Sequence, residues 1–254
     1  MYNIQPNTLF TGKTLKYMPS CHSTNDIAAQ IIQSGENVFE GTVIVTDNQT
    51  SGRGQRGNTW EASVGENLTF SIILKPNFLK ASDQFQLNVA VSLGVFDFLS
   101  EFIDEGLTVK WSNDIYYGNQ KMGGILIENS LQGYQIGHSV VGIGLNINQT
   151  QFSNLRATSL RNITQNPQKY DLSDLLKKML ESIEKNYLII KNKEYKSLKM
   201  RYLDNLFRFE EYHYFKKNGH QFLGKIMGID ENGKLGIETE GVVLYFDFKE
   251  VEFV

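Results

Sequence analysis

The stretch at residues 42–60, TVIVTDNQTSGRGQRGNTW, constrains the fold more than any other part of the chain. Its apolar start leads into GRGQRG, which has the G-x-G-x-x-G spacing of a dinucleotide-binding turn. Such a turn requires a helix directly after the glycines, because the helix N-terminus binds the pyrophosphate. Here the glycines are followed by the broken stretch NTWEASVG and then by a second strand pattern. The segment therefore predicts a strand–loop–strand unit and argues against a Rossmann βαβ unit.

Two other phosphate-binding loops are also disfavoured. The glycine-rich loop of protein kinases has the same sequence pattern between two strands. No His-Arg-Asp or Asp-Phe-Gly motif follows the loop in this sequence, however. Gly12-Lys13-Thr14 resembles the end of a P-loop, yet Asn7 stands where the first glycine is required. What remains is a loop in which two arginines stand among three glycines, so that main-chain N–H groups and guanidinium groups can both approach an anion. An ordinary surface turn exposed to solvent could also have this sequence, so both interpretations remain open.

Strand and helix patterns follow one another along the first 207 residues without a repeat. Strand patterns occur at residues 14–18, 42–46, 67–75, 108–111, 122–128 and 135–148, and helical patterns at 23–35, 83–103, 171–191 and on to about 206. Because several strands are consecutive, we expect an α+β fold whose mixed sheet is largely antiparallel, with flanking helices. From residue 208, short alternating segments between Asn-Gly and Glu-Gly turns predict a small antiparallel barrel. The expected domains are residues 1–207 and 208–254.

The composition excludes several classes of protein. A formal net charge of −3 and a pI near 5.9 argue against a dedicated nucleic-acid binder. The single cysteine, Cys21, excludes an internal disulfide framework, and the four histidines show no metal-ligand spacing among themselves. No apolar run approaches the roughly 18 residues of a membrane span. We therefore expect a soluble, cytoplasmic protein without a membrane or nucleic-acid partner.

A second group of candidate residues lies in VKWSNDIYYGNQKMGGILIE, at residues 109–128. Lys110 and Trp111 end a strand pattern, and Lys121 directly precedes a pair of glycines that a ligand could approach. A buried lysine beside glycines is costly unless an anion neutralises it, although a surface hairpin would also explain exposed lysines. Further along, Gly142 and Gly144 alternate on one face of an apolar strand, which fits a flat cavity floor, a bulge or tight sheet packing equally well.

Five motifs in order make the sequence resemble the biotin–protein ligases. They are STN at residues 23–25, Q-x-x-G-R-G-x-R-G-x-x-W at 49–60, K-W-x-N-D at 110–114, K-x-G-G-I-L-x-E at 121–128 and G-I-G-x-N-x-N at 142–148. Together they span roughly residues 12–150, and the C-terminal segment is similar to the small SH3-like β-barrel of this family. The resemblance implies a class II synthetase-like catalytic domain followed by that barrel.

The resemblance also implies a two-step reaction. The carboxylate of biotin attacks the α-phosphate of ATP to give biotinyl-5′-AMP and pyrophosphate, and a lysine of a biotin carboxyl carrier protein then attacks the activated carbonyl. ATP and biotin are the implied substrates, Mg²⁺ is expected through the ATP with no metal held by side chains, and the acceptor would be an acetyl-CoA carboxylase subunit or a similar protein. Because STN begins only 22 residues into the sequence, we expect a short form without the N-terminal DNA-binding domain of the repressor branch. A homodimer is common among relatives, but the sequence does not fix it.

Matching the motifs residue by residue gives the expected site. Catalytic roles are implied for Arg53, Lys110 and Lys121. Biotin binding is implied for Ser23, Thr24, Asn25, Gln49, Arg53, Lys121, Gly124, Gly142 and Gly144. ATP or adenylate binding is implied for Gly52, Arg53, Gly54, Gln55, Arg56, Trp60, Asn113 and Asn146. Asp114 would orient a lysine or accept a proton from the acceptor amine.

The sequence departs from the family at two of these motif positions. Gln55 stands where the family usually has an arginine that covers the activated intermediate, and Ser112 stands where proline is common. A glutamine brings no charge, so we expect weaker retention of biotinyl-5′-AMP. Two alternatives stay open, a lipoate-type protein ligase and a non-catalytic biotin or nucleotide sensor. The set of Lys110, Lys121 and Arg53 favours catalysis.

Overall fold

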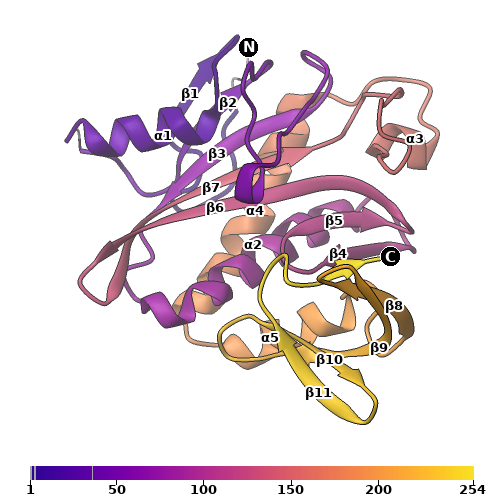
Figure 1. Ribbon diagram of the computed structural model, residues 1–254. Coiled ribbons are helices and arrows are strands. Elements are labelled where there is room, and N and C mark those ends of the chain that lie inside the picture. The colour runs from indigo at the N-terminus through magenta and orange to yellow at the C-terminus, as the bar shows by residue number, and fades with distance from the viewer. Residues whose placement is uncertain (1, 3, 36) are drawn as a thin grey trace.

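The computed structural model describes residues 2, 4–35 and 37–254, the side chain of Arg56 excepted. Figure 1 shows the arrangement of its elements. In chain order these are β1 (Leu15–Met18), α1 (Thr24–Gln33), β2 (Thr42–Thr46), η1 (Gln55–Gly57), β3 (Leu68–Leu74), η2 (Ala81–Asp83), α2 (Gln84–Leu99), β4 (Leu107–Lys110), β5 (Asp114–Tyr117), β6 (Gln120–Gln132), β7 (Gln135–Leu145), α3 (Leu160–Thr164), α4 (Leu172–Lys191), α5 (Tyr195–Asp204), β8 (Tyr212–Lys217), β9 (His220–Ile229), β10 (Leu235–Thr239), β11 (Val242–Phe246) and β12 (Glu252–Phe253).

The described strands form two sheets. A seven-stranded sheet has the order β1-β2-β3-β7-β6-β5-β4, and a five-stranded sheet has the order β11-β10-β9-β8-β12. Within the first sheet β1 and β2 are parallel, and every other neighbouring pair is antiparallel. The predicted mixed, largely antiparallel sheet with flanking helices and a small C-terminal antiparallel barrel-like sheet is confirmed.

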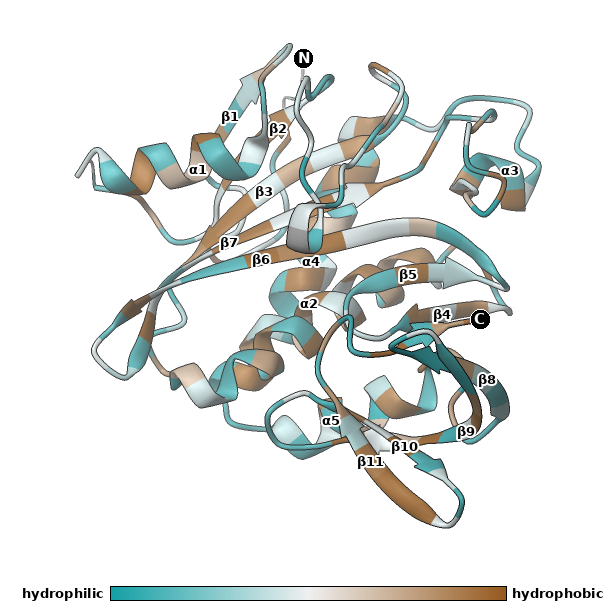
Figure 2. Cartoon of the chain, viewed as in Figure 1, coloured by the Kyte–Doolittle hydropathy of each residue, from teal (hydrophilic) through white to brown (hydrophobic). Residues whose placement is uncertain are grey.

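The two faces of the large sheet have different chemistry, because successive side chains of a strand point to opposite faces. On β3, the side chains of Leu68, Phe70, Ile72 and Leu74 enter the main hydrophobic core. That core includes the buried sides of α2 and α4, and Figure 2 shows the apolar colouring of β3. The alternate residues Thr69 and Ser71 point to the other face. Helix α1 covers part of that second face, where Ala28 packs against Ile44, Ile73 and Val140.

The small sheet packs against the β4 edge of the large sheet (Figure 1). Asn205 and Phe207 lie in the segment that joins α5 to the small sheet. The Val109 N–H donates to the Asn205 carbonyl, and the Phe207 N–H donates to the Val109 carbonyl. The indole N–H of Trp111 donates to the Gly233 carbonyl at 2.9 Å, and its ring lies 6.0 Å from that of Phe248. The two sheets are therefore joined by a buried contact directly beside the K-W-x-N-D motif.

Most predicted elements are confirmed, and the differences have local causes. The GRGQRG loop forms only the short 3-10 turn η1 and leads from β2 into the antiparallel β3, so the rejection of a Rossmann unit is confirmed. Four strands and helices were not predicted: β5, whose four residues run directly into a glycine turn, the five-residue α3, and β8 and β12 of the small sheet. Strand β6 is longer than predicted and α2 ends at Leu99, before the predicted end at residue 103. None of the described helices is long and apolar enough to cross a membrane.

Candidate functional site

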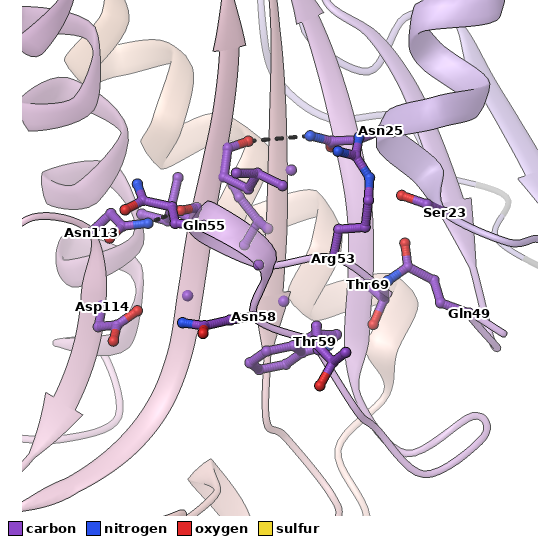
Figure 3. A pocket seen from close by; sticks show the side chains of 18 of the residues that line it. Ser23, Asn25, Gln49, Arg53, Gln55, Asn58, Thr59, Thr69, Asn113 and Asp114 are labelled. Atoms are coloured by element: carbon purple, nitrogen blue, oxygen red, sulfur yellow. Dashed lines mark hydrogen bonds between the residues drawn. The ribbon is translucent and has the colours of Figure 1, made fainter. Parts of the chain in front are cut away.

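A cavity of about 490 Å³ lies on the second face of the large sheet. Its floor is set by the register of three strands: Gly144 of β7 lies between Thr69 of β3 and Gly124 of β6, and Gly142 lies between Ser71 and Leu126. The middle strand therefore contributes a glycine to both of these rows of residues, and the absence of side chains there makes the cavity deeper. Figure 3 shows the lining side chains, with Arg53 extending toward Asn25 at one end and Asp114 lying at the other.

The two floor glycines make room for side chains of the protein itself. A Cβ atom on Gly142 would overlap the side-chain amide of Asn25. A Cβ atom on Gly144 would overlap the indole of Trp60. Asn25 and Trp60 are both predicted ligand-binding residues, so the glycines determine how closely these two side chains approach the sheet. Their role as a bare floor for a ligand was therefore only part of the explanation.

The end of the cavity at the start of α1 is a neutral hydrogen-bonding network. Ser23 occupies the N-cap position of α1, but its side chain makes no capping hydrogen bond. Gln49 takes over this role, because its Oε1 accepts the Thr24 N–H at 2.8 Å and lies 3.1 Å from the Thr24 hydroxyl. The buried Ser71 hydroxyl lies 2.7 Å from Thr24 Oγ1 and 2.6 Å from Asn25 Oδ1. Thr24, Asn25 and Gln49 are thus joined with Ser71 into one preorganised group.

Arg53 is held above this network by two carboxylates. Its nitrogens donate to both oxygens of Glu128, at 3.0 and 2.9 Å, and Nη2 also lies 2.6 Å from Asp26 Oδ1. These contacts raise the pKa of Arg53, and the hydrogen bonds that it donates to Glu128 have the largest effect. Sequence reasoning assigned no role to either acid, although Glu128 is the last letter of the K-x-G-G-I-L-x-E motif.

The opposite end of the cavity carries a lysine–aspartate pair. Lys121 Nζ lies 2.7 Å from Asp114 Oδ1, and both side chains are about one-third exposed, at 35% and 28%. Residues 114 and 124 are register partners on β5 and β6, which brings Asp114 over Gly124. The main chain of Lys121 is fixed by bonds to Arg156 and Thr158. Its ammonium group therefore faces the cavity from a rigid strand.

A second cavity, of about 530 Å³, lies beside the first. Thr59, Trp60 and Lys121 line both cavities, so these three side chains stand at their junction. The remaining walls of the second cavity come from residues 61–63, from Asn146 and from the loop at 149–157. The indole nitrogen of Trp60 is buried without a hydrogen-bond partner among the described residues. A buried donor without a partner is costly, so a ligand acceptor here would remove that cost.

Most of the predicted site residues come together around the first cavity. Its lining includes Ser23, Thr24, Asn25, Gln49, Arg53, Gly54, Gln55, Trp60, Asn113, Lys121, Gly124, Gly142 and Gly144. Gly52 lies outside the lining and packs under the Trp60 carbonyl, and Asn146 lines the second cavity. The side chain of Arg56 lies outside the described residues. Phe248, from the small sheet, also lines the cavity and had no motif to reveal it.

Lys110 does not line either cavity, which departs from its predicted catalytic placement. Its Nζ lies 4.7 Å from the ring centroids of both Tyr116 and Phe253 and 3.3 Å from the Tyr116 hydroxyl. The reason is the alternation of β4 and the packing of the small sheet, which turn the side chain into an aromatic cage. Burial lowers the pKa of Lys110 to about 8.

We predict that Lys110→Met stabilises the protein at pH 7 by on the order of 1 kcal/mol. The gain is this small because the cation–π contacts and partial exposure of Lys110 offset much of the cost of burying its charge. The folded-state pKa lies below the typical unfolded value of about 10.4, so the unfolded chain binds this proton more readily. The free-energy cost of burying the charged Lys110 is therefore complete below about pH 8 and disappears as the pH rises toward about 10.4. Urea unfolding of both proteins at pH 7 and pH 10 measures this difference. A variant less stable than wild type at pH 7 would contradict the prediction.

Comparisons with known proteins give a consistent result. Residues 17–146, just over half of the chain, match the Biotin/lipoate A/B protein ligase family. The chain is 29% identical over 239 residues to the bifunctional ligase/repressor BirA of Bacillus subtilis, covering 91% of this chain and 71% of that protein. It is 29% identical over 126 residues to the biotin–[acetyl-CoA-carboxylase] ligase of Paracoccus denitrificans, covering 49% and 52%. The structure of the biotin protein ligase from Aquifex aeolicus in complex with biotin and ATP superimposes with a TM-score of 0.79 at 29% identity, covering 95% of this chain and 100% of that one.

Proposed function

The chain belongs to the Biotin/lipoate A/B protein ligase family, and from this premise we propose that it is an ATP-dependent biotin–protein ligase. It forms biotinyl-5′-AMP from biotin and ATP and then transfers biotin to a lysine of a biotin carboxyl carrier protein. The observation that carries the proposal is the position of Lys121 at the junction of two cavities, one floored by glycines and the other beside the Trp60 indole. Two ligands that react with each other need such a junction.

In the first step, a carboxylate oxygen of biotin forms a bond to the α-phosphorus of ATP, and the bond from that phosphorus to the pyrophosphate oxygen breaks. Biotin occupies the first cavity and the nucleotide the second, so that both reacting groups meet near Lys121 Nζ. An ammonium group here reduces the repulsion between two anions and stabilises the charge that develops on the phosphoryl oxygens. No protein nucleophile is required.

The two ends of the first cavity favour one orientation of biotin. The neutral network of Thr24, Asn25 and Gln49 offers hydrogen bonds to the ureido ring. The carboxylate then points toward Lys121 and the second cavity. The base of ATP lies against Trp60, and the unpaired indole N–H supplies a donor there. Asn146, which bonds to the Thr158 carbonyl, helps to shape this cavity.

In the second step, the lysine amine of the carrier attacks the biotinyl carbonyl and the bond to the AMP oxygen breaks. The amine loses a proton, which passes to Asp114, a carboxylate that lines the first cavity beside Lys121. Its contact with Lys121 at 2.7 Å also orients that ammonium group during the first step. The relative from Paracoccus denitrificans, whose name gives acetyl-CoA carboxylase as its substrate, supports a carrier of that class as the acceptor.

Mg²⁺ would accompany ATP in this reaction. The described residues contain no group of three or more His, Cys, Asp or Glu side chains that could hold a metal ion. In nucleotide sites Mg²⁺ is usually bound chiefly by phosphates and water. The ion would supply further neutralisation of phosphate charge.

A pyrophosphate-release assay with biotin, and separately with lipoate, tests the proposal. We expect release that depends on both biotin and ATP and is absent with lipoate. Release with lipoate alone would favour the lipoate-type alternative. Tight biotin binding without pyrophosphate would favour a non-catalytic sensor. A purified carrier domain then tests the second step by its increase in mass.

The glutamine in the glycine-rich loop gives a further prediction. Gln55 lines the first cavity, and the Ser112 hydroxyl lies 3.5 Å from its side-chain Oε1, which is too long for a strong bond. We expect wild type to release some biotinyl-5′-AMP and to label bystander proteins. Gln55→Arg should reduce this labelling about 5- to 30-fold, since a charged contact is roughly 1–2 kcal/mol stronger. Labelling confined to the carrier in wild type would contradict the prediction.

A further inference from the structure

The Arg53 guanidinium is already occupied by acids of the protein. Glu128 binds it through two parallel contacts of 3.0 and 2.9 Å, and Asp26 adds a third of 2.6 Å. A planar, bidentate pair is the strongest geometry between arginine and a carboxylate. The motifs implied that this arginine takes part in catalysis and binds biotin and ATP. The geometry instead leaves it little capacity for a further anion.

The charge balance at this end of the cavity is negative. Two carboxylates face one guanidinium, which leaves an excess of one negative charge. The exposed His22 is also close, with Nε2 3.7 Å from Asp26 Oδ2. The neighbouring Thr24, Asn25 and Ser71 are neutral. A ligand carboxylate brought here would be repelled, whereas a neutral ring with N–H groups or a cation would not.

Glu128 is fixed in this position by its strand and by a second hydrogen bond. It follows Gly124 and Leu126 at alternate positions of β6, so it lies on the same face of the sheet as these two cavity-lining residues, and it contacts Arg53 of the lining. Asn25 Nδ2 donates to Glu128 Oε2 at 2.7 Å, which links the acid to the network below it. Asp26 comes from the first turn of α1. Neither acid takes part in the two chemical steps proposed above.

We propose that Asp26 and Glu128 are specificity-determining residues that hold Arg53 and keep this end of the cavity negative, so that it admits the neutral ureido ring and rejects a carboxylate. The inference rests on the proposed function and concerns the orientation of the ligand in the same site. It makes Arg53 a positioning residue for the ureido end. The carboxylate of the ligand is thereby directed to Lys121.

Binding of two ligands that differ in charge at the ureido end tests this. One is biotin, and the other is the diamine made by removing the ureido carbonyl of biotin, which carries positive charge at the same end. Kd values are measured by calorimetry for wild type, Asp26→Asn and Glu128→Gln. We expect the affinity for the diamine relative to biotin to fall about three- to tenfold in each variant, because one negative charge is removed at close range.

The ratio distinguishes charge from structural damage, because loss of packing weakens both ligands alike. Glu252→Gln serves as the matched control, since Glu252 pairs with Lys216 on the small sheet. An unchanged ratio in both cavity variants, with biotin still bound, would overturn this inference and leave the proposed function intact. Wild-type protein that binds no biotin would overturn the proposed function and this inference with it.

Discussion

Lys121→Ala is expected to lower the rate of biotin-dependent pyrophosphate release by about 100- to 1000-fold, the usual loss when one preorganised group that stabilises transition-state charge is removed. Lys121 is the described cation that faces both cavities, and its main chain is fixed by bonds to Arg156 and Thr158. The loss should fall mainly on kcat, because the charge it stabilises develops during the reaction. The KM for biotin should change less, since the ureido end of the cavity is untouched.

The control for this variant separates charge from packing. Lys121→Ala also leaves Asp114 without its 2.7 Å partner, so the added negative charge contributes to the loss. The double variant Lys121→Ala/Asp114→Asn removes both charges and should recover only a small part of the rate. Lys178→Ala, on the surface of α4, removes a lysine that pairs weakly with Glu101 at 4.0 Å and should leave the rate unchanged. A kcat within threefold of wild type in Lys121→Ala would refute a catalytic role for this lysine.

Gly144→Ala is expected to raise the KM for ATP about 10- to 100-fold. A Cβ atom at this position would overlap the Trp60 indole, and β7 is held on both sides by β3 and β6, so the indole must move. Stacking of a base on an aromatic ring contributes roughly 1–3 kcal/mol, and loss of most of this stacking corresponds to the expected increase in the KM for ATP. Biotin binding should weaken less, because Asn25 lies over Gly142, one level away from Gly144.

Steady-state kinetics with ATP varied at saturating biotin measures this effect. Gly137→Ala is the matched control, since it lies on the same strand and its added Cβ would lie 3.2 Å from the exposed Gln132 side chain and 3.6 Å, an ordinary contact distance, from the Ser130 carbonyl oxygen. Tryptophan fluorescence reports on Trp60 directly, although Trp111 also contributes to the signal. An unchanged KM for ATP in Gly144→Ala would show that the indole position does not matter for the nucleotide.

Local sequence patterns were enough for much of the fold. The alternation in residues 67–75 predicts both faces of β3, because the same period of two sets the apolar and polar sides of any strand. The missing helix after GRGQRG was readable, since a helix needs a longer periodic stretch than eight broken residues. Strand β5 was not readable, because its four residues contain no clear alternation and gain their stability from pairing with β4 and β6.

The sequence by itself determined which residue types gather at the site, through five motifs whose order is a property of the chain. Only the tertiary structure decided what each charged group does there. Arg53 and Glu128 are 75 residues apart, and no local pattern announces their pairing. Lys110 and Lys121 read alike as lysines beside strands, yet one enters an aromatic cage and the other faces two cavities. The physical reason is that strand register and the docking of the small sheet set the direction of a side chain, and both depend on contacts between distant segments.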